Sequence, residues 1–230
     1  IAAWRLLRSG KYTTAIVIGC DVQSQFIVSG FQSFKALSDS PCRPFDAERT
    51  GLNLGEAVAT MIYSIECPKK ACWQLTAGSM HNDANHISGP SRTGEGSYRC
   101  LVDVLLHCDT ADINALSVHG TATPYNDEME AIAIHRAHMQ EVPILAFKGY
   151  YGHTMGAAGV LETILTMLAL ENGTLIGNPR YDACGTSYAL NITKEHRSLG
   201  KLPMYFIKMM SGFGGCNAAI RLSYCGCDEL

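Results

Sequence analysis

The order of apolar and polar residues along the chain predicts alternating strands and helices. Short apolar or β-branched runs are typical of buried strands, and longer runs with apolar residues three or four apart are typical of helices. The expected strands are 14–19, 71–75, 113–118, 144–147, 204–209 and 218–222. The expected helices are 1–9, which ends at Gly10, then 98–107, 128–139 and 154–170. This alternation indicates an α/β fold with parallel strand pairing.

Polar segments separate the predicted elements. Residues 80–97 have loop composition throughout, and a loop of that length is commonly functional. Residues 54–64 fit either a strand or a helix, and the polar break at 67–70 indicates a domain boundary. We therefore divide the chain into a first domain, 1–66, and a second domain, 67–230.

The helix expected at 154–170 is apolar nearly all round, with Glu162 as its one charged residue. Such a composition means burial in protein or in lipid. The apolar stretch is shorter than the roughly 20 residues that a bilayer requires. It opens with Gly156-Ala-Ala-Gly159, a smooth surface for close backbone contact. We therefore expect this helix to be enclosed between sheets.

Composition narrows the possible functions. The chain of 230 residues has 47% apolar and 17% charged residues, which is typical of a folded globular protein. Its formal net charge of −3 disfavours a broad nucleic-acid surface. The 10 cysteines are scattered without a zinc-type spacing, so we expect mostly buried thiols in a reducing compartment. His135 and His138 lie three apart without a third ligand, so no metal site is expected.

Candidate reactive side chains gather at the predicted strand ends. His119 follows one predicted strand, and Lys148 and His153 follow the next. Ligand and catalytic groups collect at the carboxyl edge of an α/β sheet. The glycine loop around Phe213 adds free backbone N–H groups. Singly, each feature is more often a structural histidine, a solvated lysine or a tight turn, and it is their combination that indicates a site.

The sequence around these residues resembles a known family. HGTATPYNDEME (119–130), KGYYGHTMGAAGVLE (148–162) and SGFGGCN (211–217) are similar to the three C-terminal signatures of the β-ketoacyl-acyl carrier protein synthases, with the elongating, Cys-His-His type nearest. Weaker matches are GFQSFKALS, RPFDAERTGLNLGE and DANHISGP, which begin at Gly30, Arg43 and Asp83. The resemblance covers essentially the whole chain, in order.

The resemblance implies a thiolase-like fold, in which two similar halves form a layered αβαβα arrangement. Residues 1–66 would be the remainder of the N-terminal half, and 67–230 the complete C-terminal half. The helix at 154–170 would be one of the central helices. The family's nucleophilic cysteine would fall about two helical turns before Ile1, so we expect the chain to be a fragment that lacks it.

The activity implied by the resemblance is decarboxylative Claisen condensation of an acyl thioester with malonyl-acyl carrier protein, in fatty acid or polyketide-like synthesis. The resemblance implies His119, His153, Lys148 and Phe213 as catalytic residues. Two neutral imidazoles would stabilise the enolate oxygen that forms as CO₂ leaves. Lys148 would balance charge with Glu162. The backbone N–H of Phe213 would meet the later tetrahedral oxyanion, and its ring would gate the pocket.

Further residues receive supporting roles from the same resemblance. Those implied in binding substrate are Thr121, Thr123, Phe31, Ser88 and Gly214. Asp127 and Glu130 would support structure and charge, and Lys35 would contact an acidic carrier protein. We expect no cofactor apart from the carrier's phosphopantetheine arm. The expected partners are acyl carrier protein and a second copy in a homodimer, in the cytoplasm, with no nucleic acid or membrane.

Two alternatives stay open. The first is a non-catalytic, chain-length-factor-like partner subunit of a ketosynthase, although retention of His119, Lys148 and His153 together favours the enzyme. The second is a thiolase-fold enzyme that acts on coenzyme A thioesters, although HGTATP favours carrier protein synthases. The sequence departs from the family at Cys216, where threonine is common, at Ala57, where glycine is common, and in a poorly matching segment, 175–185. These departures concern the acyl pocket and not the chemistry.

Overall fold

The computed structural model describes residues 1–66, 71–86, 89–200, 202 and 204–225. Its helices are α1 (Ala2–Arg8), α2 (Gln25–Ser33), α3 (Glu95–Leu105), α4 (Pro124–Arg136), α5 (Lys148–Tyr151) and α6 (Ala158–Glu171). Its strands are β1 (Thr14–Asp21), β2 (Ala57–Ser64), β3 (Cys72–Asn82), β4 (Ile113–Ser117), β5 (Ile144–Leu145), β6 (Thr174–Leu175), β7 (Arg197–Ser198), β8 (Tyr205–Gly212) and β9 (Cys216–Cys225). Short 3₁₀ turns cover Thr110–Asp112, Met155–Ala157 and Phe213–Gly215.

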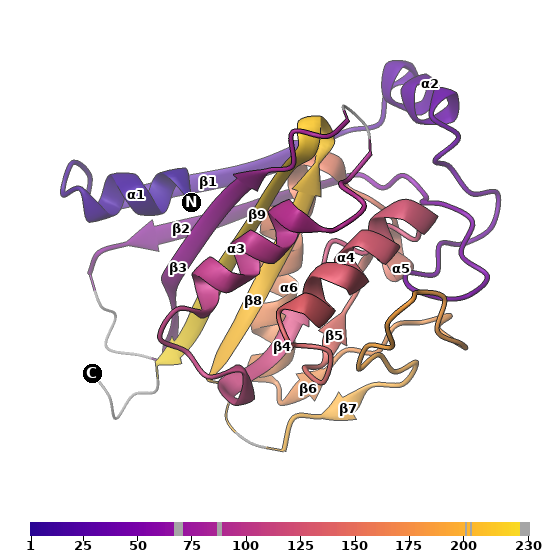
Figure 1. Ribbon diagram of the computed structural model, residues 1–230. Coiled ribbons are helices and arrows are strands. Elements are labelled where there is room, and N and C mark those ends of the chain that lie inside the picture. Colours follow the sequence, from indigo (N-terminus) through magenta and orange to yellow (C-terminus); the bar gives the residue numbers. More distant parts are fainter. Residues whose placement is uncertain (67–70, 87–88, 201, 203, 226–230) are drawn as a thin grey trace.

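The main sheet has five strands in the order β3-β9-β8-β4-β5 (Figure 1). β3, β9 and β8 pair antiparallel, whereas β8, β4 and β5 pair parallel. The parallel part confirms the predicted α/β class and places the carboxyl ends of β4 and β5 side by side. β1 and β2 form a separate antiparallel ribbon, so residues 54–64 contain a strand and no helix.

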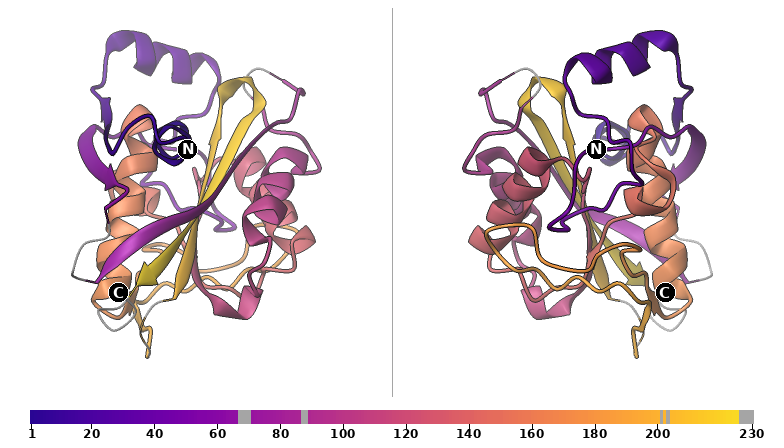
Figure 2. Two further views of the ribbon diagram at one scale, coloured as in Figure 1. Left: turned by 90° about the vertical axis from the view of Figure 1, so that its left-hand side faces the viewer. Right: turned by 90° about the vertical axis from the view of Figure 1, so that its right-hand side faces the viewer.

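Helices and sheets are stacked in layers (Figure 2). α3 and α4 cover one face of the main sheet, and α6 covers the other. The β1–β2 ribbon packs against the opposite side of α6. The four layers, α/β/α/β, therefore match part of the expected αβαβα arrangement, and the prediction that the helix at 154–170 is enclosed between sheets is confirmed. In the described ranges, no helix has the length and apolar character needed to cross a membrane.

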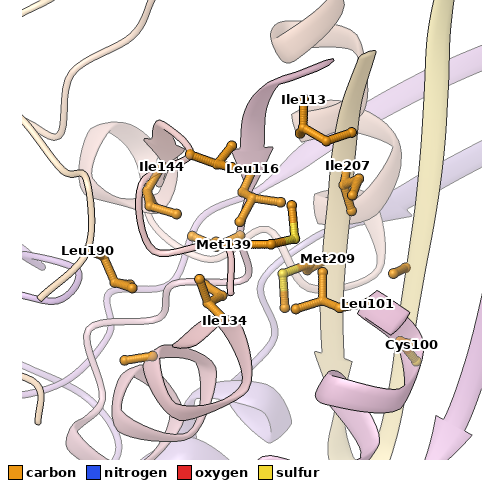
Figure 3. Packing of buried hydrophobic residues seen from close by; sticks show 14 of the residues in the cluster. Cys100, Leu101, Ile113, Leu116, Ile134, Met139, Ile144, Leu190, Ile207 and Met209 are labelled. Atoms are coloured by element: carbon orange, nitrogen blue, oxygen red, sulfur yellow. The ribbon is translucent and has the colours of Figure 1, made fainter. Parts of the chain in front are cut away.

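One apolar cluster fills the space between the main sheet and helices α3 and α4 (Figure 3). Leu101 and Ile134 project from the helices, and Leu116, Ile207 and Met209 project from the sheet. A second cluster lies toward α6 and contains Ala115, Leu145, Phe147, Leu170, Leu175, Phe206 and Leu222. Each fully buried side chain of this size contributes about 1.5–3 kcal/mol. The core thus holds β4 from both faces, which explains its uninterrupted apolar sequence.

The loop expected at 80–97 is shorter than predicted, because β3 and α3 both extend into it. The Asp83 carboxylate gives the reason. It accepts the backbone N–H of Ser91 at 3.1 Å and that of Gly96 at 2.8 Å. A side chain that binds N–H groups in the first turn of a helix stabilises that end, so α3 begins before the apolar run on which the prediction rested.

Two other predictions of local structure need correction. The helix predicted to begin at residue 128 begins earlier, as α4, with Thr123 as its N-cap and Pro124 as its first helical residue. Proline suits that position because its missing N–H would have no partner there. Residues 25–33, for which no helix or strand was predicted, form α2, where the Ser24 hydroxyl accepts the N–H of Ile27 at 3.3 Å. The predicted boundary at 67–70 lies outside the described residues.

Cys20, Cys42, Cys100, Cys108, Cys184, Cys216 and Cys225 are free thiols. The expectation that most are buried is wrong: Cys42 and Cys100 are buried, whereas Cys20, Cys184 and Cys216 are exposed. Cys20 lies on the outer face of the β1–β2 ribbon. The same face exposes large apolar side chains, namely Ile16, Ile18, Val58 and Ile62. An apolar face of this kind marks a surface that another element or chain covers.

Gly19 sets the distance between β1 and the turn that leads into α6. A Cβ atom at Gly19 would lie 2.9 Å from the carbonyl oxygen of Gly156 and 3.0 Å from the Cα of Ala157. We expect Gly19→Ala to lower the free energy of unfolding by about 1–3 kcal/mol, because backbone on both sides must move. Urea denaturation measures this change.

Gly30 supplies the matched control, because nothing lies within 4 Å of a Cβ added there. Gly30→Ala in α2 should leave the free energy of unfolding unchanged or raise it by up to about 1 kcal/mol, since alanine has the higher helix propensity. Equal effects of the two substitutions would contradict the close approach at Gly19.

Candidate active site

The carboxyl ends of β4 and β5 bring His119 and His153 together. The two ring centroids lie 5.0 Å apart and the ring planes are inclined by 81°. His119 is 5% exposed and His153 is 9% exposed. The histidines therefore form an edge-to-face pair that is almost closed to water.

Residues from the first part of the chain fix the position of His153. Its backbone N–H donates to the carbonyl of Asn53 at 2.7 Å, and its own carbonyl accepts the N–H of Gly55 at 2.9 Å. On the ring, Nδ1 accepts the backbone N–H of Met155 at 3.0 Å. Because Nδ1 is the acceptor, the neutral ring carries its proton on Nε2. His153 is therefore held as a hydrogen-bond donor at Nε2.

The backbone of His119 is held from two directions. Its N–H donates to Oε1 of Glu130 at 2.7 Å, and the next N–H, of Gly120, donates to Oε2 of the same carboxylate at 2.7 Å. Its carbonyl accepts from Nζ of Lys148 at 2.6 Å. Nδ1 of the ring is buried and has no hydrogen-bond partner among the described residues. These backbone contacts thus fix the position of the ring, and Nδ1 remains available for a hydrogen bond to another group.

A buried ion cluster lies beneath the histidines. Nζ of Lys148 contacts Oε1 of Glu162 at 2.7 Å, as the resemblance implied. Nζ of Lys208 contacts Oε2 of the same carboxylate and donates to the carbonyl of Val118 at 2.9 Å. The side chains of Lys148, Lys208 and Glu162 are at most 2% exposed. One carboxylate on α6 therefore bridges the ammonium group of Lys148, on α5, and that of Lys208, in the middle of β8.

The surroundings keep both imidazoles uncharged. Burial lowers the pKa of His119 well below its usual value, and the charges of Lys148 and Lys208 lower it further. Burial, followed by the same two lysines, lowers the pKa of His153 well below its usual value. A buried ring without a carboxylate partner beside cations favours the neutral form. At neutral pH the pair therefore consists of two neutral rings.

Asp127 and Glu130, one turn apart on α4, hold the loop that carries His119. Oδ1 of Asp127 accepts the N–H of Thr121 at 3.0 Å, and Oδ2 accepts the N–H of Phe45 at 2.7 Å. Burial raises the pKa of Asp127 to about 6 and that of Glu130 to about 7. The loop needs such support because Gly120 and Ala122 have positive φ angles of 46° and 63°.

The resemblance also implied residues that bind the substrate or its carrier, namely Thr121, Thr123, Gly214, Ser88 and Lys35. The hydroxyls of Thr121 and Thr123 are 2.8 Å apart, within hydrogen-bond distance. Gly214 stands in the β8–β9 hairpin with a φ of 79°, a conformation that glycine adopts readily. Lys35 is exposed just after α2. Ser88 lies outside the described residues.

Phe213, in the hairpin, is the centre of an aromatic group. Phe31 stacks on it with ring centroids 5.5 Å apart, and Phe34 meets it edge-on at 5.4 Å. Phe213 is 53% exposed, so its ring stands at the surface. Phe213 therefore packs against Phe31, to which the resemblance gave a role in substrate binding, and against Phe34, to which it gave none.

Lys208 is the main site residue that the sequence analysis missed. It lies inside an apolar strand, YFIKMM, in which a lone lysine can be taken for a solvent-facing position. Two signals were available in the sequence. One was a charged residue in the middle of an otherwise apolar predicted strand, and the other was the acidic residue Glu162 on a helix expected to be enclosed.

Comparison with known proteins identifies the family. Residues 1–64 match the model of the β-ketoacyl synthase N-terminal domain, and residues 74–182 match that of the C-terminal domain. The 3-oxoacyl-[acyl-carrier-protein] synthase 2 of Mycobacterium leprae is 29% identical over 95% of this chain and 56% of that protein. The protein of the same name from Coxiella burnetii is 31% identical over 85% of this chain and 51% of that protein.

A solved structure gives the same result. It is described as a ketosynthase (ApeO) in complex with its chain length factor (ApeC) from Xenorhabdus doucetiae. It matches with a TM-score of 0.89 and 29% identity, over 97% of this chain and 56% of that chain. The chain belongs to the β-ketoacyl synthase family and has the thiolase-like fold of these ketosynthases. It spans about half the length of the curated relatives that it matches.

The raised pKa of Glu130 predicts a pH-dependent stability difference. A carboxyl with a pKa of about 7 in the folded state and its ordinary value of 4.5 in the unfolded state binds its proton more tightly when folded. Its contribution to stability is therefore complete below pH 4.5 and is lost as the pH rises through about 7, with a slope of at most about 1.4 kcal/mol per pH unit.

We expect the stability of the unaltered protein relative to Glu130→Gln to fall between pH 4.5 and 7, measured by urea denaturation. Glutamine is also destabilising at every pH, because its NH₂ group must face the N–H of His119 or Gly120. The exposed Asp39, changed to asparagine, serves as the control and should give a constant difference over this range. A constant difference for Glu130→Gln would contradict the prediction.

Proposed function

We propose that the protein containing this chain catalyses decarboxylative Claisen condensation of an acyl thioester with a malonyl thioester on acyl carrier protein. The observation that carries the proposal is the pair of neutral, buried imidazoles at the ends of β4 and β5, with ring centroids 5.0 Å apart. The 3-oxoacyl-[acyl-carrier-protein] synthases among its relatives support this reaction class.

In the first step the bond between the malonyl carboxylate and its α-carbon breaks, and CO₂ leaves. The electron pair of that bond moves into the thioester and forms an enolate, whose oxygen becomes anionic. His153 donates from Nε2 to this oxygen, and His119 supplies a second N–H. Neutral N–H donors that are already in place stabilise developing charge without reorganisation, and the nearby Lys148 favours the anion further.

In the second step the α-carbon attacks the acyl group carried as a thioester on a cysteine. A new carbon–carbon bond forms, and the carbon–sulfur bond breaks as the cysteine leaves as a thiolate. The backbone N–H of Phe213 binds the tetrahedral oxyanion before that bond breaks. The cysteine itself belongs to sequence before Ile1, because α1 resembles the end of the helix that carries it in the family.

The remaining predicted residues serve the carrier protein and its arm. The hydroxyls of Thr121 and Thr123 bind amides of the phosphopantetheine arm, with Gly214 beside them. Phe31 and Phe213 form the mouth of the acyl pocket. Lys35, exposed after α2, meets the acidic carrier protein. No cofactor takes part apart from the arm of the carrier.

The proposal includes the arrangement of the chain. The two halves meet between residues 66 and 67, which is supported by family models that end at 64 and begin at 74. The protein forms a homodimer through the β1–β2 ribbon, which is supported by the apolar side chains exposed there, such as Ile16 and Ile62. It acts in the cytoplasm.

A non-catalytic partner subunit is the second candidate. The solved ketosynthase that this chain resembles was determined together with its chain length factor. His119, Lys148 and His153 are all retained and converge in one buried site, which favours the enzyme. The encoded residue at the nucleophile position before Ile1 decides between the two: a cysteine supports the enzyme, and glutamine supports the partner subunit.

We expect His153→Ala in the full-length protein to lower the rate of malonyl-carrier decarboxylation by about 10²–10³-fold, because one preorganised donor to the enolate oxygen is lost. Release of CO₂ measures the rate. The exposed His138 provides the control, since His138→Asn keeps a residue that tolerates its positive φ of 56° and should retain the full rate. A normal rate in folded His153→Ala would overturn the proposed mechanism.

We expect Lys35→Glu to raise the KM for malonyl-carrier protein and to leave kcat unchanged, because a rim charge acts on the encounter of the partners. The increase should shrink at high salt, because the Debye length falls from about 8 Å at physiological ionic strength to about 3 Å at 1 M. Lys11→Glu is the control and should keep the original KM, because Lys11 lies before β1, whereas Lys35 lies just after α2. The same KM for Lys35→Glu at low salt would contradict docking at this residue.

A further inference from the structure

Lys208 is a buried lysine to which the mechanism above gives no role. Its Nζ donates to the carbonyl of Val118 at 2.9 Å and pairs with Oε2 of Glu162. Lys148 does the same for the next carbonyl, that of His119, and for Oε1 of Glu162. The two lysines thus hold successive carbonyls at the end of β4, and one carboxylate connects them.

This arrangement makes the orientation of His119 depend on β8. Lys208 is paired in register with Ser117 on β4, two residues before His119. From β8 it reaches forward to the peptide that joins Val118 to His119. The opposite side of that peptide, the N–H of His119, is bound by Glu130 on α4. Both polar groups of this peptide are therefore bound, and Lys208 binds one of them, the carbonyl oxygen.

The cluster also contains more positive than negative charge. Two ammonium groups share one carboxylate, whereas one lysine would be enough to neutralise it. The charged groups that face Lys208 are Glu162 from α6, Lys148 from α5 and Glu130 from α4. The charge of Lys208 lowers the pKa of both His119 and His153. Its own pKa, lowered by burial to about 8, leaves it charged at neutral pH.

We propose that Lys208 is a positioning residue for the histidine pair: it holds the Val118 carbonyl so that the ring of His119 faces His153, and its charge keeps both rings neutral. The proposal rests on the proposed function, because the paired neutral rings are assigned there to the enolate oxygen. Lys208 acts through the histidines and does not touch the substrate.

The test uses Lys208→Met in the full-length protein, a substitution that keeps length and burial and removes the charge. We expect the acid limb of the pH profile of malonyl decarboxylation to move to higher pH by about one unit, because the imidazoles lose a neighbouring cation. The KM for the malonyl carrier should stay unchanged, and kcat measured at a pH below both acid limbs should fall about tenfold, as one pH unit implies. Lys194→Met, which breaks an exposed ion pair with Asp182, is the control and should keep the original profile.

A second variant tests the same inference in case Lys208→Met does not fold. Lys208→Ala leaves space in which ethylammonium can take the place of the lost side-chain end. We expect ethylammonium to restore kcat saturably and to return the acid limb toward its original pH, whereas propanol, of similar size and without charge, should restore neither. Thermal unfolding, recorded with and without the amine, reports the folded fraction in each case.

The outcomes separate this inference from the proposed function. If the unaltered protein releases CO₂, His153→Ala does not, and Lys208→Met keeps the original acid limb, the role of Lys208 is overturned alone. If Lys208→Met does not fold, the alanine variant decides, and absence of rescue by ethylammonium overturns the inference. If His153→Ala is as active as the unaltered protein, the proposed function itself is wrong.

Discussion

The carboxylate of Glu162 is the group on which the site depends. It bridges Lys148 and Lys208, which together bind the carbonyls of Val118 and His119. Removing a charged group from water costs several kcal/mol, and only well-placed partners offset that cost. Glu162 can serve as partner to both lysines because α6 is enclosed between two sheets, where water cannot compete. The layered architecture is therefore a requirement of the electrostatics beneath the histidines.

The loop that carries His119 is held by groups of opposite charge on its two sides. Asp127 and Glu130 bind its N–H groups, and the lysines bind its carbonyls. Each charged group contacts the end of the peptide dipole that it attracts, so the contacts reinforce one another. The positive φ angles of Gly120 and Ala122 persist because these contacts hold the backbone from both directions.

The sequence predicted the elements whose burial leaves a simple pattern. β4 and α6 are apolar on nearly every side because each lies between two packed layers, and both were placed correctly. α2 was missed because its phenylalanines cover no core. β3 was cut short because its outer half alternates, with Ser79 and His81 bound to Asp103 of α3 at 2.5 and 2.7 Å. Such partners on another element leave no mark in the local pattern.

The sequence predicted the site residues that lie at strand ends or within family motifs. His119, His153 and Lys148 stand at strand ends and within recognisable segments. The clamp formed by Asp127 and Glu130 was anticipated only as general support, because its contacts run to backbone N–H groups that no sequence pattern indicates. Lys208 was missed for a related reason. Its role depends on an ion pair with Glu162, which lies in a different layer and 46 residues away in the chain.

The contacts that assemble the site join distant parts of the chain, and this affects when the site forms during folding. The bond from Phe45 to Asp127 closes a loop of 82 residues, and that from Lys208 to Val118 closes one of 90. Loop closure of this length must precede the contacts that compensate for it, which makes such steps slow. On the ribosome, β8 emerges after every other element that contacts Glu162. The bond from Lys208 to the Val118 carbonyl, which fixes the peptide before His119, therefore forms only after β8 has left the ribosome.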